Sequence, residues 1–267
     1  MWTDLIVPFL VTLSGMMLVM ASAWLVQRAN DNAGWVDVFW TFGTGAAGVI
    51  VALWPMPAQS IGRQILVAAL SAVWAIRLGA YIALRVAGTA EDTRYVHFKA
   101  QWGSAFQRRL LGFVLLQAPA TALLVLSILV AAHGGAPILG LRDLLGAGIL
   151  LIAIGGEAIA DEQMRQFKAR RDRDLIFDRG LWAWSRHPNY FFEWFGWLAY
   201  SALAFDPATP LTYLTWLAPT LMYLILRHGT GVPALEASLL RSRGDAFRAY
   251  QSRVSAFFPL PPRGRQT

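Results

Sequence analysis

The chain has 267 residues, of which 56% are hydrophobic and only 15% are charged, and its mean hydropathy is +0.45. A soluble domain carries about 25% charged residues, so this composition excludes an ordinary water-soluble enzyme, a disordered chain and a collagen-like chain. Because the chain contains no cysteine, disulfides, thiolate metal sites and cysteine nucleophiles are excluded too. The composition indicates an integral membrane protein.

Seven stretches are long and apolar enough to cross a bilayer, which takes about 20 mostly apolar residues. They cover residues 5–27, 35–54, 62–85, 108–132, 143–161, 189–206 and 210–227. The first stretch lacks a basic start and is too long for the apolar core of a cleaved signal peptide, so it counts as a span. The predicted fold is therefore all-α, a polytopic membrane protein with seven transmembrane helices in a single domain over residues 1–267.

The basic residues predict the orientation of this bundle. With seven spans, 20 of the 23 Lys and Arg residues lie on the face that carries the C-terminus, whereas only Arg63 and Arg142 lie on the other face. This asymmetry places the N-terminus outside and the C-terminus in the cytoplasm, in the inner (plasma) membrane if the chain is bacterial. It also explains the formal net charge of +7, so nucleic acid is not an expected partner. No internal repeat is visible, which disfavours a transporter built from inverted repeats, and we expect a monomer.

Residues 43–48 (GTGAAG) match the glycine pattern of dinucleotide-binding loops, but they lie inside an apolar span and follow no strand. We interpret them as small residues that allow close helix contact. The four histidines, His97, His133, His187 and His228, show no metal-ligand spacing, so no metal is expected. The basic and aromatic tail from residue 241 is typical of an amphipathic segment lying on the inner leaflet, and the alternative is a cap over a cofactor pocket.

Polar residues line up on the faces of three spans, where each charge costs at least ~2.5–3.5 kcal/mol at mid-membrane. The third span carries Arg77, Tyr81 and Arg85 at i, i+4 and i+8, and a charged cluster with Arg94 and Tyr95 follows it. The fifth span carries Glu157, Asp161, Arg165 and Lys168 on one face. The entrance to the sixth span adds Trp184, Arg186, His187, Asn189, Tyr190, Glu193 and Trp197, and Asp37 stands alone in the second.

These residues could simply pair across helices and hold the bundle together. However, basic, aromatic and amide groups concentrated at the cytoplasmic ends of three helices suit a large anionic ligand entering from the cytosol. Arginines bind phosphates, carboxylates and Asn bind ribose or amide groups, and aromatic rings stack. A dinucleotide or S-adenosylmethionine meets this description.

The stretch Gly-Leu-Trp-x-Trp-Ser-Arg-His-Pro-Asn-Tyr at 180–190, followed by Glu193, resembles the C-terminal half of the steroid 5-alpha-reductase family, above all its bacterial membrane branch. The segment 157–161 and the aromatic-Pro tail fit the same pattern. This family is similar to sterol reductases and, more distantly, to isoprenylcysteine carboxyl methyltransferases. The resemblance is best over residues 150–260 and weaker over 35–100.

The resemblance implies a seven-span helical fold that binds NADPH from the cytosol, mainly through residues 74–100 and 150–260. The charged cluster and the resemblance together give the candidate cofactor-binding residues: Arg77, Arg85, Arg94, Glu157, Asp161, Arg165, Lys168, Trp184, Arg186, His187, Asn189, Tyr190 and Glu193. The chain departs from the family at Trp74, where the eukaryotic enzymes have a Tyr that helps polarise the steroid ketone. It also lacks their Gln-Glu pair in the second span, where Asp37 is the nearest acid.

The expected reaction is therefore NADPH-dependent reduction of a C=C bond conjugated to a ketone in a steroid-like lipid. Such a reduction needs hydride at the beta carbon, a proton at the alpha carbon and an acid that stabilises the developing enolate. The candidate catalytic residues are Asp37, Tyr81 and Tyr95, and the candidate substrate-binding residues are Trp40, Trp74 and Trp197. The expected partners are the hydrophobic enone substrate and membrane lipid.

Two other functions stay open. An S-adenosylmethionine-dependent methyltransferase acting on a lipid or prenyl-cysteine would account for residues 186–190 and Glu193. It gives no reason for so many basic residues, whereas a pyrophosphate and a 2′-phosphate do. The second is a non-catalytic lipid- or sterol-binding membrane protein.

Overall fold

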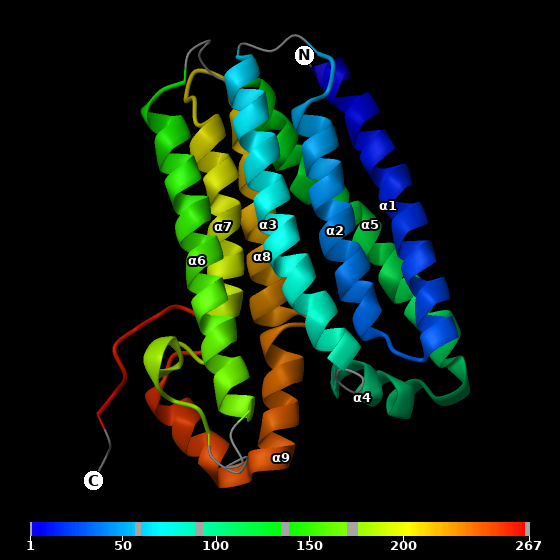
Figure 1. Cartoon of the computed structure of the whole chain (residues 1–267), viewed down its shortest axis with the longest axis vertical. Helices are drawn as coiled ribbons and strands as arrows, with labels where there is room; N and C mark the ends of the chain where they lie inside the picture. The colour runs from blue at the N-terminus through cyan, green and yellow to red at the C-terminus, as the bar shows by residue number, and fades with distance from the viewer. Residues whose placement is uncertain (1, 57–59, 89–92, 135–138, 170–175, 265–267) are drawn as a thin grey trace. The chain divides into compact units, whose positions relative to one another are not determined.

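A computed structural model gives the structure of the chain and describes residues 2–56, 60–88, 93–134, 139–169 and 176–264. Within these ranges the regular structure is helical, with one isolated bridge between Ser185 and Ser255. Figure 1 shows the α-helices, whose bounds are as follows: α1 (Trp2–Asn30), α2 (Gly34–Ala52), α3 (Ile61–Gly88), α4 (Thr93–Trp102), α5 (Phe106–His133), α6 (Leu141–Ala169), α7 (Pro188–Ala204), α8 (Leu217–Tyr223) and α9 (Val232–Arg253). The short segments between them are η1 (Gly103–Ala105), η2 (Gly180–Ala183), η3 (Pro210–Trp216) and η4 (Leu224–His228).

Five helices in the described part of the chain are long and apolar enough to span a membrane, namely α1, α2, α3, α5 extended back to Phe98, and α6. The predicted all-α class and membrane character are therefore confirmed. The sixth predicted span corresponds to α7, which has 17 residues. The seventh is divided into the 3-10 segment η3, the helix α8 and the π-helical turn η4. Pro219 lies in the first turn of α8, where its missing N–H removes no helical hydrogen bond.

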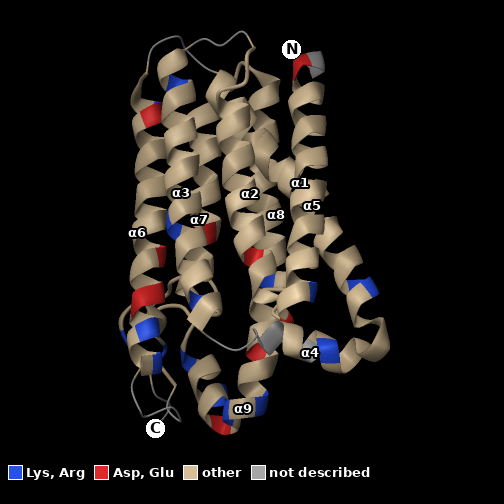
Figure 2. Ribbon diagram, turned by 45° about the vertical axis from the view of Figure 1, so that its right-hand side comes forward, with Lys and Arg blue, Asp and Glu red and all other residues tan. Residues whose placement is uncertain are grey.

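The chain forms two compact units. Unit 1 comprises Met1–Ala147 and Tyr200–Ala218, and unit 2 comprises Gly148–Ala199 and Pro219–Thr267. In unit 1 the charged residues of α1 and α5 lie in their terminal turns, whereas α9 of unit 2 carries charges along its length (Figure 2). Terminal charges with an apolar middle are what a membrane-spanning helix requires.

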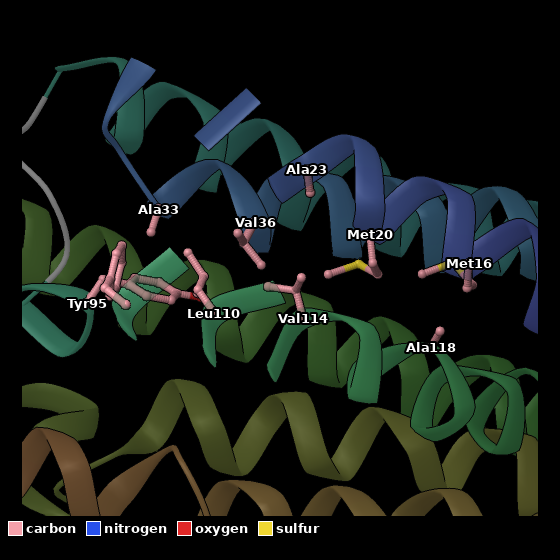
Figure 3. Close-up of a cluster of buried hydrophobic side chains, with 10 residues drawn as sticks. Met16, Met20, Ala23, Ala33, Val36, Tyr95, Leu110, Val114 and Ala118 are labelled. Atoms are coloured by element: carbon pink, nitrogen blue, oxygen red, sulfur yellow. The ribbon is translucent and has the colours of Figure 1, made fainter. Parts of the chain in front are cut away.

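The core of unit 1 includes a stripe of α1 that faces a stripe of α5. Figure 3 shows Met16, Met20 and Ala23 opposite Leu110, Val114 and Ala118, with Ala33, Val36 and Tyr95 at one end. The spacing of these residues, three or four apart, places each set on one helix face. Because Tyr95 belongs to this cluster, the short helix α4 packs against the bundle rather than projecting from it.

The glycine-rich segment of α2 makes close helix contacts, as predicted. A Cβ atom added to Gly45 would lie 2.1 Å from the Cβ of Ala75, and one added to Gly48 would lie 3.3 Å from the Cβ of Ser71. Both neighbours belong to α3. The absence of side chains at these two glycines therefore lets the backbones of α2 and α3 approach each other.

A buried ion pair in unit 1 joins the first turn of α3 to the first turn of α6. The Arg63 side chain is fully buried, and its Nε and Nη2 atoms donate to the two carboxylate oxygens of Asp143 at 2.6 and 2.8 Å. The Nη1 atom of Arg63 donates to the carbonyl of Gly134, and the backbone N–H of Gly140 donates to Asp143. The distribution of basic residues in the sequence assigns Arg63 only to the membrane face opposite the C-terminus and does not predict its burial with a bidentate partner.

Unit 2 contains α6 from Gly148 onward and α7 as far as Ala199, together with α8 from Pro219, η4, α9 and the segment that follows α9. The helices α6 and α7 approach closely, since a Cβ on Gly156 would lie 2.4 Å from the ring of Phe192. The indole N–H of Trp182 donates to the carbonyl of Ala160. The α9 residues Phe247 and Tyr250 are buried, so this tail contributes a core and is more than a surface segment.

Candidate functional site

Two predicted catalytic residues meet in unit 1. Asp37 lies in the first turn of α2, and Tyr95 of α4 is only 2% exposed. The phenol O–H of Tyr95 donates to Oδ1 of Asp37 over 3.4 Å, a long hydrogen bond. The third predicted catalytic residue, Tyr81, lies on α3, where the guanidinium carbon of Arg85 is 5.9 Å from its ring centroid. Arg77 occupies the preceding turn of α3, and the side chain of Arg94 lies outside the described residues.

Two of the three predicted substrate-binding tryptophans also meet in unit 1. The rings of Trp40 and Trp74 are edge to face, with centroids 6.3 Å apart. The indole N–H of Trp40 donates to the hydroxyl of Thr121 at 2.9 Å, which fixes the orientation of this ring. Aromatic surfaces of this kind suit a flat apolar ligand.

Unit 2 buries three predicted carboxylates. Glu157 and Asp161 lie one turn apart on α6, and Glu193 lies on α7; their exposures are 6%, 5% and 8%. The Asn189 amide lies 3.5 Å from Oδ1 of Asp161, at the limit of a hydrogen bond. The third predicted tryptophan, Trp197, donates its indole N–H to Glu193 at 3.0 Å. Carboxylates buried in a membrane helix are costly, and they usually mark a functional site.

The predicted phosphate-binding residues of α6 lie at its exposed end. The Arg165 side chain is 65% exposed and donates to both carboxylate oxygens of Glu162 at 2.7 Å, and Lys168 is exposed one turn further on. An exposed pair of this kind is weak and can exchange partners. Both basic groups therefore remain accessible to an anionic ligand.

Arg186 and His187, in the segment before α7, both contact the carboxylate of Glu236 in α9. No role for Glu236 was predicted from the sequence. The guanidinium of Arg186 donates to Glu236 through Nε at 2.7 Å and Nη2 at 3.2 Å. The Nε2 atom of His187 lies 3.1 Å from the same carboxylate. Arg186 also donates through Nη1 to the carbonyls of Gln251 and Val254. Four of its five N–H groups are thus engaged by this chain itself.

The pKa values of His187 and Glu236 are both lowered from their ordinary values. Burial lowers the pKa of His187 more than the neighbouring carboxylate raises it. Burial raises the pKa of Glu236, but hydrogen bonds from His187 and Arg186 outweigh it and lower the pKa to about 2. Glu236 is therefore an anion at neutral pH, and His187 favours its neutral form.

The two aromatic residues of the same segment are placed differently. Tyr190 stacks on His187, with ring centroids 5.7 Å apart and an interplanar angle of 12°. Trp184 is 47% exposed, and its carbonyl accepts a hydrogen bond from the backbone of Leu260. Tyr190 thus packs on the buried His187 ring, whereas Trp184 faces outward beside the tail.

No group of three or more His, Asp or Glu side chains in the described ranges is arranged to hold a metal ion. The polar groups of unit 2 instead offer buried hydrogen-bond acceptors on α6 and α7 and exposed cations at the end of α6. This combination can bind hydroxyl or amide groups together with phosphates.

Comparison with known proteins gives one match. No curated protein and no solved structure matches the chain. A family model described as "Protein of unknown function (DUF1295)" matches residues 23–254, which include most of each unit and every candidate residue named above. Because this match extends over most of the chain, the protein belongs to the DUF1295 family.

Proposed function

We propose that the chain is an NADPH-dependent reductase that reduces a C=C bond conjugated to a ketone in a steroid-like lipid. The observation that carries the proposal is the burial of Glu157, Asp161 and Glu193 on two closely packed helices of a membrane protein. A structural role alone does not require three buried carboxylates beside an amide and exposed cations, whereas a phosphorylated nucleotide uses all of these groups.

The proposal includes a seven-span membrane arrangement. The helix α7 serves as the sixth span, and η3, α8 and η4 together serve as the seventh. A cytoplasmic C-terminus agrees with the distribution of Lys and Arg, of which 20 of 23 fall on one side of such a bundle. The candidate nucleotide residues then lie at the cytoplasmic ends of their helices, on the side where NADPH is available.

The residues of unit 2 fit the parts of NADPH. The carboxylates of Glu157, Asp161 and Glu193 can accept hydrogen bonds from ribose hydroxyls, and Asn189 can both donate and accept. Arg165 and Lys168 can pair with phosphates. Arg186 is better suited to holding the site together, since its guanidinium already binds Glu236 and two carbonyls. NADPH, when bound, would supply the hydride.

The acid that polarises the substrate ketone is assigned to Asp37 and Tyr95, with Tyr81 as the other candidate. The Tyr95 hydroxyl donates to Asp37 in this structure, and in the proposal it donates to the substrate ketone instead. Trp40 and Trp74 in the same unit offer ring faces to an apolar substrate. If Asp37→Asn and Tyr95→Phe both retain wild-type turnover of a 3-oxo-delta-4 steroid with NADPH, this assignment is wrong.

A ligand screen tests the cofactor. Purified protein in detergent is heated with NADPH, NADH or S-adenosylmethionine, and we expect the largest rise in Tm with NADPH. The Asp161→Asn variant should bind NADPH about 10- to 100-fold more weakly, as expected for loss of a charged hydrogen-bond acceptor. The control is Asp245→Asn, which changes a carboxylate that is 95% exposed and pairs with Arg248, not with a candidate phosphate-binding residue, and it should bind as wild type.

The screen also separates the alternatives. Stabilisation by S-adenosylmethionine alone would contradict the reductase and favour a methyltransferase. Activity is measured as loss of NADPH absorbance with a panel of hydrophobic enones. Enone binding without NADPH consumption across the panel would instead indicate a lipid-binding protein.

A further inference from the structure

We propose that Glu236 is a positioning residue that holds His187 in the tautomer with its proton on Nε2, so that Nδ1 accepts a hydrogen bond from an N–H or O–H group of the bound nucleotide. The identity of the ligand rests on the proposed function. The assignment of the tautomer rests only on contacts within unit 2.

The carboxylate of Glu236 is surrounded by donors. Oε1 faces Nε of Arg186 at 2.7 Å and Nε2 of His187 at 3.1 Å. Oε2 accepts from Nη2 of Arg186 at 3.2 Å and from the Gln251 amide at 2.8 Å. An ionised carboxylate can only accept hydrogen bonds, so the His187 nitrogen that faces it must carry the proton.

The other ring nitrogen of His187 is consequently the acceptor in the neutral imidazole. The residue is 1% exposed, and Nδ1 is a buried atom that has no hydrogen-bond partner within the part of the chain that the structure describes. Tyr190 stacks on the ring, and the backbone N–H of His187 donates to the hydroxyl of Ser185 at 3.1 Å. Ring and backbone are thus both fixed, and the direction of the Nδ1 lone pair is fixed with them.

This arrangement selects the chemistry of the ligand at this point. A neutral acceptor binds a hydroxyl or an amide N–H, whereas a phosphate oxygen brings no proton and is repelled by the lone pair. A ribose hydroxyl, the nicotinamide carboxamide and the adenine amino group are the groups of NADPH that can donate. Nδ1 of His187 therefore accepts a hydrogen bond from a donor group of the nucleotide, and the phosphates bind to other residues.

Nitrogen NMR of the imidazole tests the tautomer without any ligand. The protein is labelled with ¹⁵N-histidine, and the His187 signals are identified by their loss in His187→Asn. We expect a protonated Nε2 and an unprotonated Nδ1 at neutral pH. A protonated Nδ1, or a doubly protonated ring, overturns the proposal whether or not NADPH binds.

Two variants separate positioning from general support. Glu236→Gln removes the charge that fixes the proton, so we expect a mixture of tautomers and about 3- to 10-fold weaker NADPH binding, as for one weakened hydrogen bond. Gln251→Ala removes a different donor from the same carboxylate and should leave the His187 signals unchanged. If Gln251→Ala alters the tautomer as much as Glu236→Gln does, Glu236 has no specific positioning role. Should Glu236→Gln fail to fold, the wild-type spectrum still decides the tautomer.

Addition of nucleotide tests the contact. NADPH should shift the Nδ1 signal toward the hydrogen-bonded value. ADP-ribose 2′-phosphate, which lacks nicotinamide, shows whether the donor is the carboxamide or a group in the rest of the nucleotide. NADPH that binds without moving Nδ1 overturns the contact. If NADPH does not bind at all, the proposed function fails together with the ligand contact, while the tautomer measured in the free protein stands on its own result.

Discussion

Replacement of Asp143 by Asn should be strongly destabilising, because it leaves the Arg63 guanidinium buried without its counter-charge. The carboxylate is 3% exposed and Arg63 is fully buried, and two short hydrogen bonds join them. The Asn side chain has the same shape, but its NH₂ group must face an Arg63 donor in either orientation, and in one of them it also faces the Gly140 N–H. Breaking a buried pair from one side costs about 3–5 kcal/mol. At about 2–4 °C per kcal/mol, Tm should fall by roughly 6–20 °C.

The assay is thermal unfolding of the purified variants in one detergent, followed by intrinsic tryptophan fluorescence. The control is Asp245→Asn, which breaks an ion pair with Arg248 of similar length, 2.7 Å, but with side chains 95% and 69% exposed; it should leave Tm unchanged. The double variant Arg63→Met with Asp143→Leu should recover most of the loss, because it removes both charges. A fall in Tm of less than about 3 °C for Asp143→Asn, by the same conversion, would refute the reasoning.

Three further predictions concern the other features of the fold. The folded-state pKa of Glu236 is about 2, whereas its ordinary value is 4.5. Its ionised form therefore stabilises unit 2 above pH 4.5, and this contribution is lost as the pH falls toward 2. Between pH 4.5 and 2, the Tm of Glu236→Gln should decline less steeply than that of the wild type. Gly45→Val should cost about 1–3 kcal/mol of unfolding free energy by overpacking against α3, whereas Gly15→Ala, where a new Cβ meets nothing within 4 Å, should not lower Tm. Tyr250→Phe removes the hydrogen bond from a buried phenol to the Trp182 carbonyl and should cost about 1 kcal/mol; an unchanged Tm would show that this contact contributes nothing.

The helices were predictable from the sequence because membrane-spanning segments need long apolar runs. The predicted spans at 5–27, 62–85 and 108–132, for example, coincide with α1, α3 and α5 to within a few residues. The seventh span was predicted as one helix, whereas the structure has η3, α8 and η4 there, since hydropathy does not register a change of helical type. The helix α4 was missed because it is short and half of its ten residues are polar.

Part of the candidate site could also be found from spacing. Residues on one helix face, such as Glu157 and Asp161, are visible as i, i+4 pairs. The partners that the sequence did not reveal lie far apart along the chain: Glu236 is 50 residues from Arg186, and Asp143 is 80 residues from Arg63. Such contacts depend on how the helices pack, and they cannot be predicted from the local spacing of residues. Glu236 lies before the basic and aromatic tail that begins at residue 241, and no motif in the sequence around it indicates a functional role.

The segment after α9 has a practical consequence for anyone who modifies this protein. Ser185 donates to the carbonyl of Phe257, Arg186 binds the carbonyl of Val254, and the Ser255 carbonyl accepts from the Arg186 backbone. A truncation that removes residues 254–257 would therefore disturb the environment of His187, some seventy positions upstream. Fusion partners and affinity tags belong beyond Gly264, and loss of function in shorter versions should be traced to this anchoring before any catalytic explanation is sought.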